Sequence, residues 1–120
     1  MNEKDAQLLA VLRIARDMSR RSAGLSLREA LARTRYAELR PRFGPADLLP
    51  LIEADATLAD EWISYSMDKR TSGGWYITEQ GEIGRLDAPQ ATIRFDSVEE
   101  AVAEYVVREL DDWAGLAGAR

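Results

Sequence analysis

One stretch decides the fold: Trp75-Tyr76-Ile77-Thr78-Glu79-Gln80-Gly81-Glu82-Ile83-Gly84-Arg85-Leu86. Two short runs rich in β-branched and aromatic residues flank Glu79-Gln80-Gly81, which is the pattern of a β-hairpin. Asp87-Ala88-Pro89-Gln90 reads as a loop, and Ala91 to Phe95 alternates again as a third strand with Ala91, Ile93 and Phe95 on its apolar face. We therefore expect a three-stranded antiparallel sheet over about 75–95, with helices packed on its apolar face.

A long helix follows the sheet. Ser97-Val98-Glu99-Glu100 is a capping box, and the helical pattern continues over about 98–114. Its apolar stripe contains Val98, Val102, Tyr105, Val106, Leu110 and Trp113. Its acidic residues are Glu99, Glu100, Glu104, Glu109, Asp111 and Asp112. We interpret these acidic residues as a solvated face, and a docking face for a basic partner is the alternative.

Four helical patterns precede the sheet. They predict helices over residues 3–21, 26–40, 47–54 and 57–70. Ser26-Leu27-Arg28-Glu29 is a capping box, and Asp47 and Thr57 are the expected N-caps of the next two helices. The fold class is therefore α+β, with about four N-terminal helices in a single domain over residues 1–120.

Composition restricts the available chemistry. The chain of 120 residues contains neither cysteine nor histidine. Disulfides and thiolate sites are therefore excluded, and a zinc site would need carboxylates alone, so we expect no metal and no cofactor. Any catalysis would have to use Asp, Glu, Lys, Arg, Tyr, Ser or Thr, which makes an enzyme the less favoured class.

The sequence contains no sign of a membrane segment or a secretory signal. A transmembrane helix needs about 18 or more consecutive apolar residues, and the chain has no such run. The charged start Met1-Asn2-Glu3-Lys4-Asp5 is unlike a signal peptide. We therefore expect a cytoplasmic protein that does not contact a membrane.

Charge is distributed unevenly along an acidic chain of net charge −5. Residues 1–42 carry ten Lys or Arg and five Asp or Glu, whereas residues 43–120 carry six and sixteen. The arginine-rich first part could meet phosphates or an acidic partner. We favour the simpler interpretation, in which these basic helices lie against the acidic remainder of the same domain.

The densest polar stretch joins the fourth predicted helix to the sheet. The candidate residues for binding an anion or a partner are Asp68, Lys69, Arg70, Thr71, Ser72, Gly73, Gly74 and Tyr76. Cations supply charge and glycines let backbone N–H groups approach a ligand. The structural alternative is favoured, because Lys and Arg suit a helix C-terminus and the two glycines suit a cap and turn. The spacing also differs from a phosphate-binding loop.

Trp62 to Tyr76 has the pattern W-x-x-Y-S-x-D-K-R-T-S-G-G-W-Y, which resembles a stretch in small uncharacterised bacterial proteins. The resemblance covers about fifteen residues, with a weaker likeness in the final helix. It implies a bacterial origin and adds no catalytic residue.

Three functions compete. The favoured one is a small bacterial partner-binding protein of an immunity-like, antitoxin-like or accessory-subunit kind, and self-association is an open variant of it. The second is a winged-helix-like nucleic-acid binder, although the helix at 47–54 that would enter the groove contains no Lys or Arg. The third is a small enzyme with an anion site at 68–76.

Overall fold

The computed structural model describes residues 2–19, 26–69 and 74–116. These residues form an α+β fold of seven α-helices, one short 3-10 helix and three strands. The elements are α1 (Glu3–Leu12), α2 (Ile14–Met18), α3 (Leu27–Thr34), α4 (Tyr36–Leu39), η1 (Arg40–Arg42), α5 (Pro45–Ala54), α6 (Ala56–Asp68), β1 (Trp75–Ile77), β2 (Glu82–Arg85), β3 (Ala88–Arg94) and α7 (Val98–Trp113). The expected α+β class, the antiparallel sheet and the C-terminal helix are confirmed.

The sheet is antiparallel, with strand order β1-β2-β3. The predicted loop over 87–90 is wrong in part, because β3 already begins at Ala88. A proline suggested a loop there, but β3 is an edge strand, where a missing N–H group costs little. The pairing of β2 with β3 changes register between Ile83, which faces Ile93, and Arg85, which faces Ala88.

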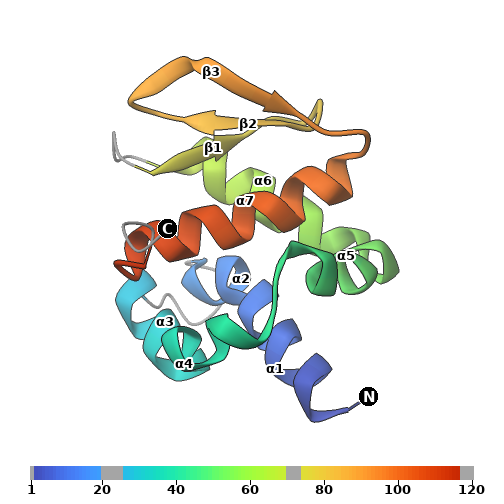
Figure 1. The fold of residues 1–120 in the computed structure, drawn as a ribbon, viewed down its shortest axis with the longest axis vertical. Helices are drawn as coiled ribbons and strands as arrows, with labels where there is room; N and C mark the ends of the chain where they lie inside the picture. The colour runs from blue at the N-terminus through green and yellow to red at the C-terminus, as the bar shows by residue number, and fades with distance from the viewer. Residues whose placement is uncertain (1, 20–25, 70–73, 117–120) are drawn as a thin grey trace.

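Helix α7 lies in the middle of the molecule, between the sheet above it and the N-terminal helices below it (Figure 1). Layers on both sides bury nine of its residues, including Glu109 and Asp111. The prediction that the acidic residues of this helix form a solvated face is therefore wrong for these two carboxylates. A single amphipathic stripe describes a helix with one packed face, and α7 has two.

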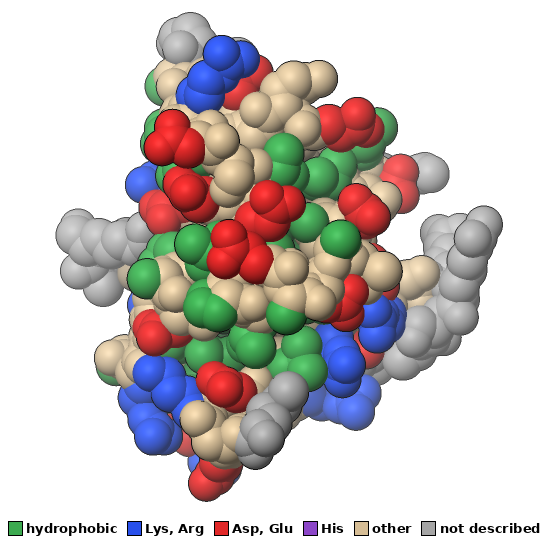
Figure 2. Space-filling view, turned by 90° about the vertical axis from the view of Figure 1, so that its right-hand side faces the viewer, with side chains coloured by type: hydrophobic (Ala, Val, Ile, Leu, Met, Phe, Trp, Pro, Cys, Tyr) green, Lys and Arg blue, Asp and Glu red, His purple; other side chains and the backbone are tan. Residues whose placement is uncertain are grey.

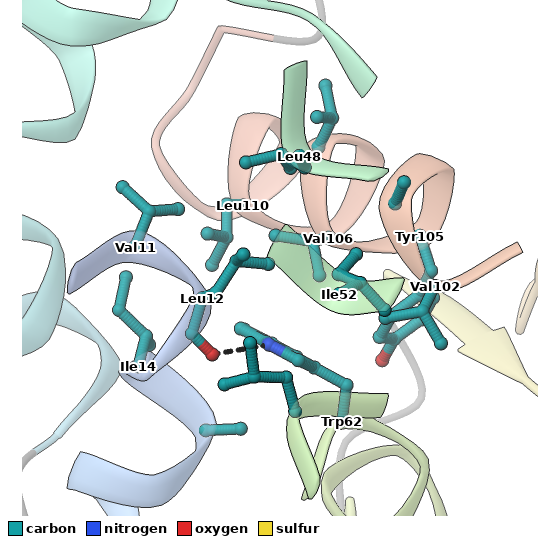
Figure 3. Close-up of a cluster of buried hydrophobic side chains, with 14 of the residues drawn as sticks. Val11, Leu12, Ile14, Leu48, Ile52, Trp62, Val102, Tyr105, Val106 and Leu110 are labelled. Carbon is teal, nitrogen blue, oxygen red and sulfur yellow. Dashed lines mark hydrogen bonds between the residues drawn. The ribbon is translucent and has the colours of Figure 1, made fainter. Parts of the chain in front are cut away.

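The core gathers around α7, α5 and the break between α1 and α2 (Figure 3). The indole of Trp62 is fully buried and its Nε1–H donates to the carbonyl oxygen of Leu12 at 2.7 Å. This bond lies where α1 ends, so one predicted helix over 3–21 becomes two helices with Arg13 between them. A side chain bonded to a helix carbonyl is a common cause of such a break.

Two of the predicted N-caps are confirmed and two are wrong. Ser26 and Glu29 form the expected reciprocal capping box, and Ser97 caps α7 through its hydroxyl. The predicted N-caps Asp47 and Thr57 are wrong, because Gly44 and Asp55 occupy those positions. Asp47 lies in the first turn and accepts the N–H of Gly44, whereas the side chain of Asp55 accepts the N–H of Thr57, so both helices begin earlier than predicted.

The second predicted helix is also divided. Arg35 has a left-handed backbone, with φ of 53°, which ends α3 before α4 begins. The short helix α4 then buries Tyr36 and Leu39 in the core. Across the described residues, every helix is too short or too polar to cross a bilayer.

Candidate functional site

The candidate site is the junction between α6 and β1, where a buried ion pair joins the end of α6 to α7. Lys69 follows the last residue of α6, and its Nζ lies 2.6 Å from a carboxylate oxygen of Glu109. The side chains are only 5% and 0% exposed, so both charges are removed from water. Burying two charges is costly unless each one is paired and hydrogen-bonded.

Glu109 meets that condition through further donors. The hydroxyl of Tyr65 donates to it at 2.7 Å, the Nε1–H of Trp113 at 3.1 Å and the backbone N–H of Trp75 at 2.8 Å. Burial, reinforced by the charge of Glu109, raises the pKa of the Tyr65 hydroxyl above its ordinary value. This tyrosine therefore stays protonated and donates a hydrogen bond, which does not suit the role of a general base.

The same group of side chains closes the outer edge of β1. The carbonyl oxygen of Trp75 accepts from Lys69 Nζ at 3.0 Å and from the Tyr105 hydroxyl at 3.3 Å, while its N–H donates to Glu109. Two residues further, Ile77 exchanges two hydrogen bonds with the hydroxyl of Ser66 on α6. The backbone groups that an edge strand normally offers to another strand are therefore occupied here by side chains.

Gly74 lies directly over the ion pair. Its φ of +84° is in the left-handed region, where a Cβ atom is disfavoured. A Cβ atom at this position would also lie 2.6 Å from Glu109 Oε1 and 2.7 Å from Lys69 Nζ. These polar atoms are held by their own hydrogen bonds, so they cannot move aside without weakening the ion pair. Two independent constraints therefore require glycine at this position: the left-handed backbone and the lack of space for a Cβ atom.

The structure places the sequence-predicted site residues in different environments. Lys69 and Gly74 come together at the buried ion pair, and Asp68 is exposed at the end of α6. Tyr76 lies on the other face of the sheet, where its ring passes over Gly84 and its hydroxyl is 3.3 Å from Thr92 Oγ1. The remaining candidates, Arg70, Thr71, Ser72 and Gly73, lie outside the described residues.

Helix α7 carries a second buried carboxylate that points to the opposite layer. Asp111 accepts hydrogen bonds from the hydroxyl of Tyr36 at 2.7 Å and from Nε of Arg40 at 2.9 Å. Two residues along an α-helix rotate by about 200°. Glu109 therefore faces the sheet and α6, whereas Asp111 faces α4 and η1.

The sequence did not predict that Glu109 and Asp111 are buried and bind cations of other elements. The signal that could have found Asp111 is its place in the last turn of a helix, where a negative charge opposes the dipole and calls for a compensating cation. For Glu109, the signal is the interval of four residues between it and the aromatic Trp113 on one helix face. Neither signal names the partner on another element.

Outside the junction, the basic first part of the chain (residues 1–42) is joined to the remainder by ion pairs, but it also keeps exposed arginines. Ion pairs join the basic first part to the remainder at Lys4–Asp47, Arg16–Glu61 and Arg40–Asp111. This supports the interpretation that the basic helices lie against the rest of the chain, residues 43–120, which we call the acidic part. Several arginines of the first part are exposed and form no ion pair within the described residues: Arg13, Arg28, Arg33 and Arg42.

In the acidic part, some described carboxylates are left without an ion pair and no described cation is. Its described cations, in residues 43–69 and 74–116, are all paired with acids of the same part: Lys69, Arg85, Arg94 and Arg108. Carboxylates without an ion pair among the described residues are Glu53, Asp55, Asp60, Asp68, Glu79, Asp96, Glu99 and Glu100. One face of the molecule shows acidic side chains spread among apolar ones over its middle, with most Lys and Arg side chains toward its lower margins (Figure 2).

Comparison with known proteins adds no assignment, since no protein-family model, curated protein or solved structure matches the chain. Within the described residues, no group of three or more acidic side chains is placed to hold a metal ion.

The ion pair generates the first prediction. Replacing Lys69→Met leaves a buried carboxylate without its cation, so we expect the free energy of unfolding to fall by about 3–5 kcal/mol. Glu109→Gln should cost a comparable amount, and the double variant should cost less than the two single losses together by at least about 1 kcal/mol. Urea denaturation followed by tryptophan fluorescence measures all three.

The exposed ion pair between Arg35 and Glu38 provides the control. Glu38→Gln removes a carboxylate whose side chain is 68% exposed, and it should change stability by no more than about 0.5 kcal/mol. Strict additivity of the Lys69 and Glu109 effects would show that the two side chains do not depend on each other, contrary to the structure.

Gly74 generates the second prediction, with Gly115 as the matched control. Both have left-handed backbones, but a Cβ atom at Gly115 meets nothing within 4 Å. Gly115→Ala should therefore cost only the backbone strain, about 1–2 kcal/mol. Gly74→Ala should exceed that loss by at least about 1 kcal/mol, because it also displaces the buried pair. Equal losses in thermal or urea unfolding would contradict this account of the junction.

Proposed function

We propose that the chain is a small protein-binding domain that recognises a basic partner through its acidic part, in the manner of an immunity protein, an antitoxin or an accessory subunit. The observation that carries the proposal is the charge segregation: the described residues from 43 onward contain eight carboxylates without an ion pair and no cation without one. Such a surface attracts a basic protein and raises the rate of encounter with it.

The use of charge inside the molecule supports the same proposal. Lys69 is neutralised by Glu109 and lies under Gly74, so the cation that was the best candidate for binding an anion already has an internal role. The polar groups of the junction thus stabilise the fold, and the charges of the described residues from 43 onward that remain available to another molecule are carboxylates.

Two triple variants test the proposal. The first, Asp60→Asn with Asp68→Asn and Glu79→Gln, removes three of the exposed carboxylates without touching a described ion pair. The second is the matched control, Arg28→Gln with Arg33→Gln and Arg42→Gln, which removes three exposed cations. Each tagged variant is used to capture proteins from cells of the source organism, and the association rate of the captured partner is then measured with purified components.

We expect a stoichiometric basic partner whose association rate falls about tenfold or more with the carboxylate variant and much less with the arginine variant. Raising NaCl from about 0.05 M to about 0.5 M should reduce the same rate. Absence of any stoichiometric partner, or a partner that is sensitive only to the arginine variant, would contradict the proposal.

A second candidate is binding of nucleic acid by the basic helices. The observation that favours it is the set of exposed arginines on α3 and η1, namely Arg28, Arg33 and Arg42. Phosphate binding through these residues would weaken with salt and would be lost in the arginine variant. Fluorescence anisotropy with a labelled DNA duplex at low ionic strength separates the two candidates, since the acidic-part proposal predicts no binding.

A further inference from the structure

A shallow apolar depression lies between the second half of α6 and the turn that joins β1 to β2. Its volume is about 250 Å³, and its lining residues are Ile63, Met67, Ile77, Thr78, Glu79 and Gln80. Ile63 and Ile77 are 8% and 3% exposed and form the floor, whereas the side chain of Met67 stands in solvent at 69% exposure. The depression therefore joins a fixed apolar floor to one free apolar wall.

The size of the depression indicates the kind of occupant. Pockets for small organic ligands usually enclose about 300–1,000 Å³ and bury most of the ligand. This depression is smaller and open to solvent. It fits a single large apolar side chain presented by another protein, which is the usual form of an anchor at an interface.

Met67 has the properties of an interface residue. It is the most exposed large hydrophobic side chain among the described residues, at 69%, compared with 43% for Trp113 and 38% for Ile93. Methionine is unbranched and polarizable, so it adapts its shape to an incoming side chain at many protein-binding surfaces. Covering it would remove apolar surface from water, which is favourable.

One carboxylate lines the depression and two more lie close to its lining residues in the sequence of α6, and we call these three its acidic rim: Glu79, Asp60 and Asp68. Asp60, Ile63 and Met67 lie at positions i, i+3 and i+7 and so share one face of α6. Asp68 follows Met67, and Glu79 lies on the opposite wall. These three carboxylates are exposed, and none forms an ion pair with a described residue. Among the described lining residues of the depression there is no Lys or Arg.

From this apolar floor and acidic rim, we propose that the depression is the anchor site for a protein segment in which one large apolar side chain is flanked by Lys or Arg residues. The apolar side chain fills the depression against Ile63, Ile77 and Met67, and the flanking cations meet the carboxylates of the rim. This inference rests on the proposed function and names the partner chemistry that the acidic part recognises.

Three peptides of equal length test the proposal by nuclear magnetic resonance on the ¹⁵N-labelled full chain. In the first, a central leucine is flanked by two lysines on each side; the second replaces the leucine with serine, and the third replaces the lysines with glutamates. The leucine–lysine peptide should shift amide signals of 63–68 and 77–80 in a saturable manner. It should bind about fivefold or more tightly than the serine peptide, and the glutamate peptide should not bind.

Two variants localise the effect. Met67→Ser should weaken binding of the leucine–lysine peptide about fivefold or more, because it removes one wall of the depression. Its matched control is Leu86→Ser, which alters another exposed apolar side chain, at 36% exposure, outside the lining residues. That variant should bind as the unchanged chain does. Thermal unfolding of both variants checks that each remains folded.

Each other outcome overturns the inference in a recognisable way. Equal binding of the leucine and serine peptides, with shifts spread over all exposed carboxylates, would leave the proposed function in place and remove the anchor site. Equal binding by the Met67→Ser and unchanged chains would do the same. Dimers in sedimentation that Met67→Ser abolishes would assign the depression to a second copy of this chain. No shift with any peptide would overturn the anchor site, while partner capture would still decide the proposed function.

Discussion

The buried carboxylate of Glu109 is the interaction on which the arrangement of the fold depends. It joins α7 to a segment that is distant in sequence, since its bonds reach Tyr65 on α6, Lys69 after α6 and Trp75 at the start of β1. A carboxylate without these donors would be strongly unfavourable in the interior. The helix, the chain that leaves it and the first strand are therefore held in one relative placement.

The consequence extends to both faces of α7. This helix separates the sheet from the N-terminal helices (Figure 1), and each of its two buried carboxylates bonds to one cation and one tyrosine hydroxyl. The partners of Glu109 are Tyr65 of α6 and Lys69 just after it, and those of Asp111 are Arg40 of η1 and Tyr36 of α4. Apolar burial provides the larger share of the stabilising free energy, but it has little directional preference. The two carboxylates restrict the arrangement further, because each keeps its hydrogen bonds only when the elements that carry its partners lie in one position against α7.

Features set by neighbouring residues could be predicted from the sequence. The box at Ser26 and Glu29, the cap at Ser97 and the hairpin at 79–81 involve side chains and backbone only a few positions apart. The fate of Lys69 could not be predicted, because its partner lies on a helix that is distant in sequence. A helical pattern likewise shows which residues are apolar, but it does not show that α7 would be covered from two sides and would bury Glu109 and Asp111.

Pairing with distant residues also explains why the candidate site does not expose a cation. The cation Lys69 is internal, and near the exposed side chain of Met67 the available charge is carried by carboxylates such as Asp68 and Glu79. Charge that is used inside the fold sets the structure, and charge left without a partner is free to meet another molecule. The proposal of a basic partner follows from this division and not from any single polar residue of the junction.

Native-state hydrogen exchange of the Trp75 and Ile77 amides tests the central claim most directly. Both face the outer edge of β1 and donate to side chains, to Glu109 and Ser66 respectively. If those side chains hold the sheet to α6 and α7, both amides should exchange only through global unfolding. The outward-facing amide of Arg94 on β3 should exchange much faster, since alternation along the strand directs it to the open edge. Exchange of Trp75 and Ile77 at the rate of Arg94 would contradict the account.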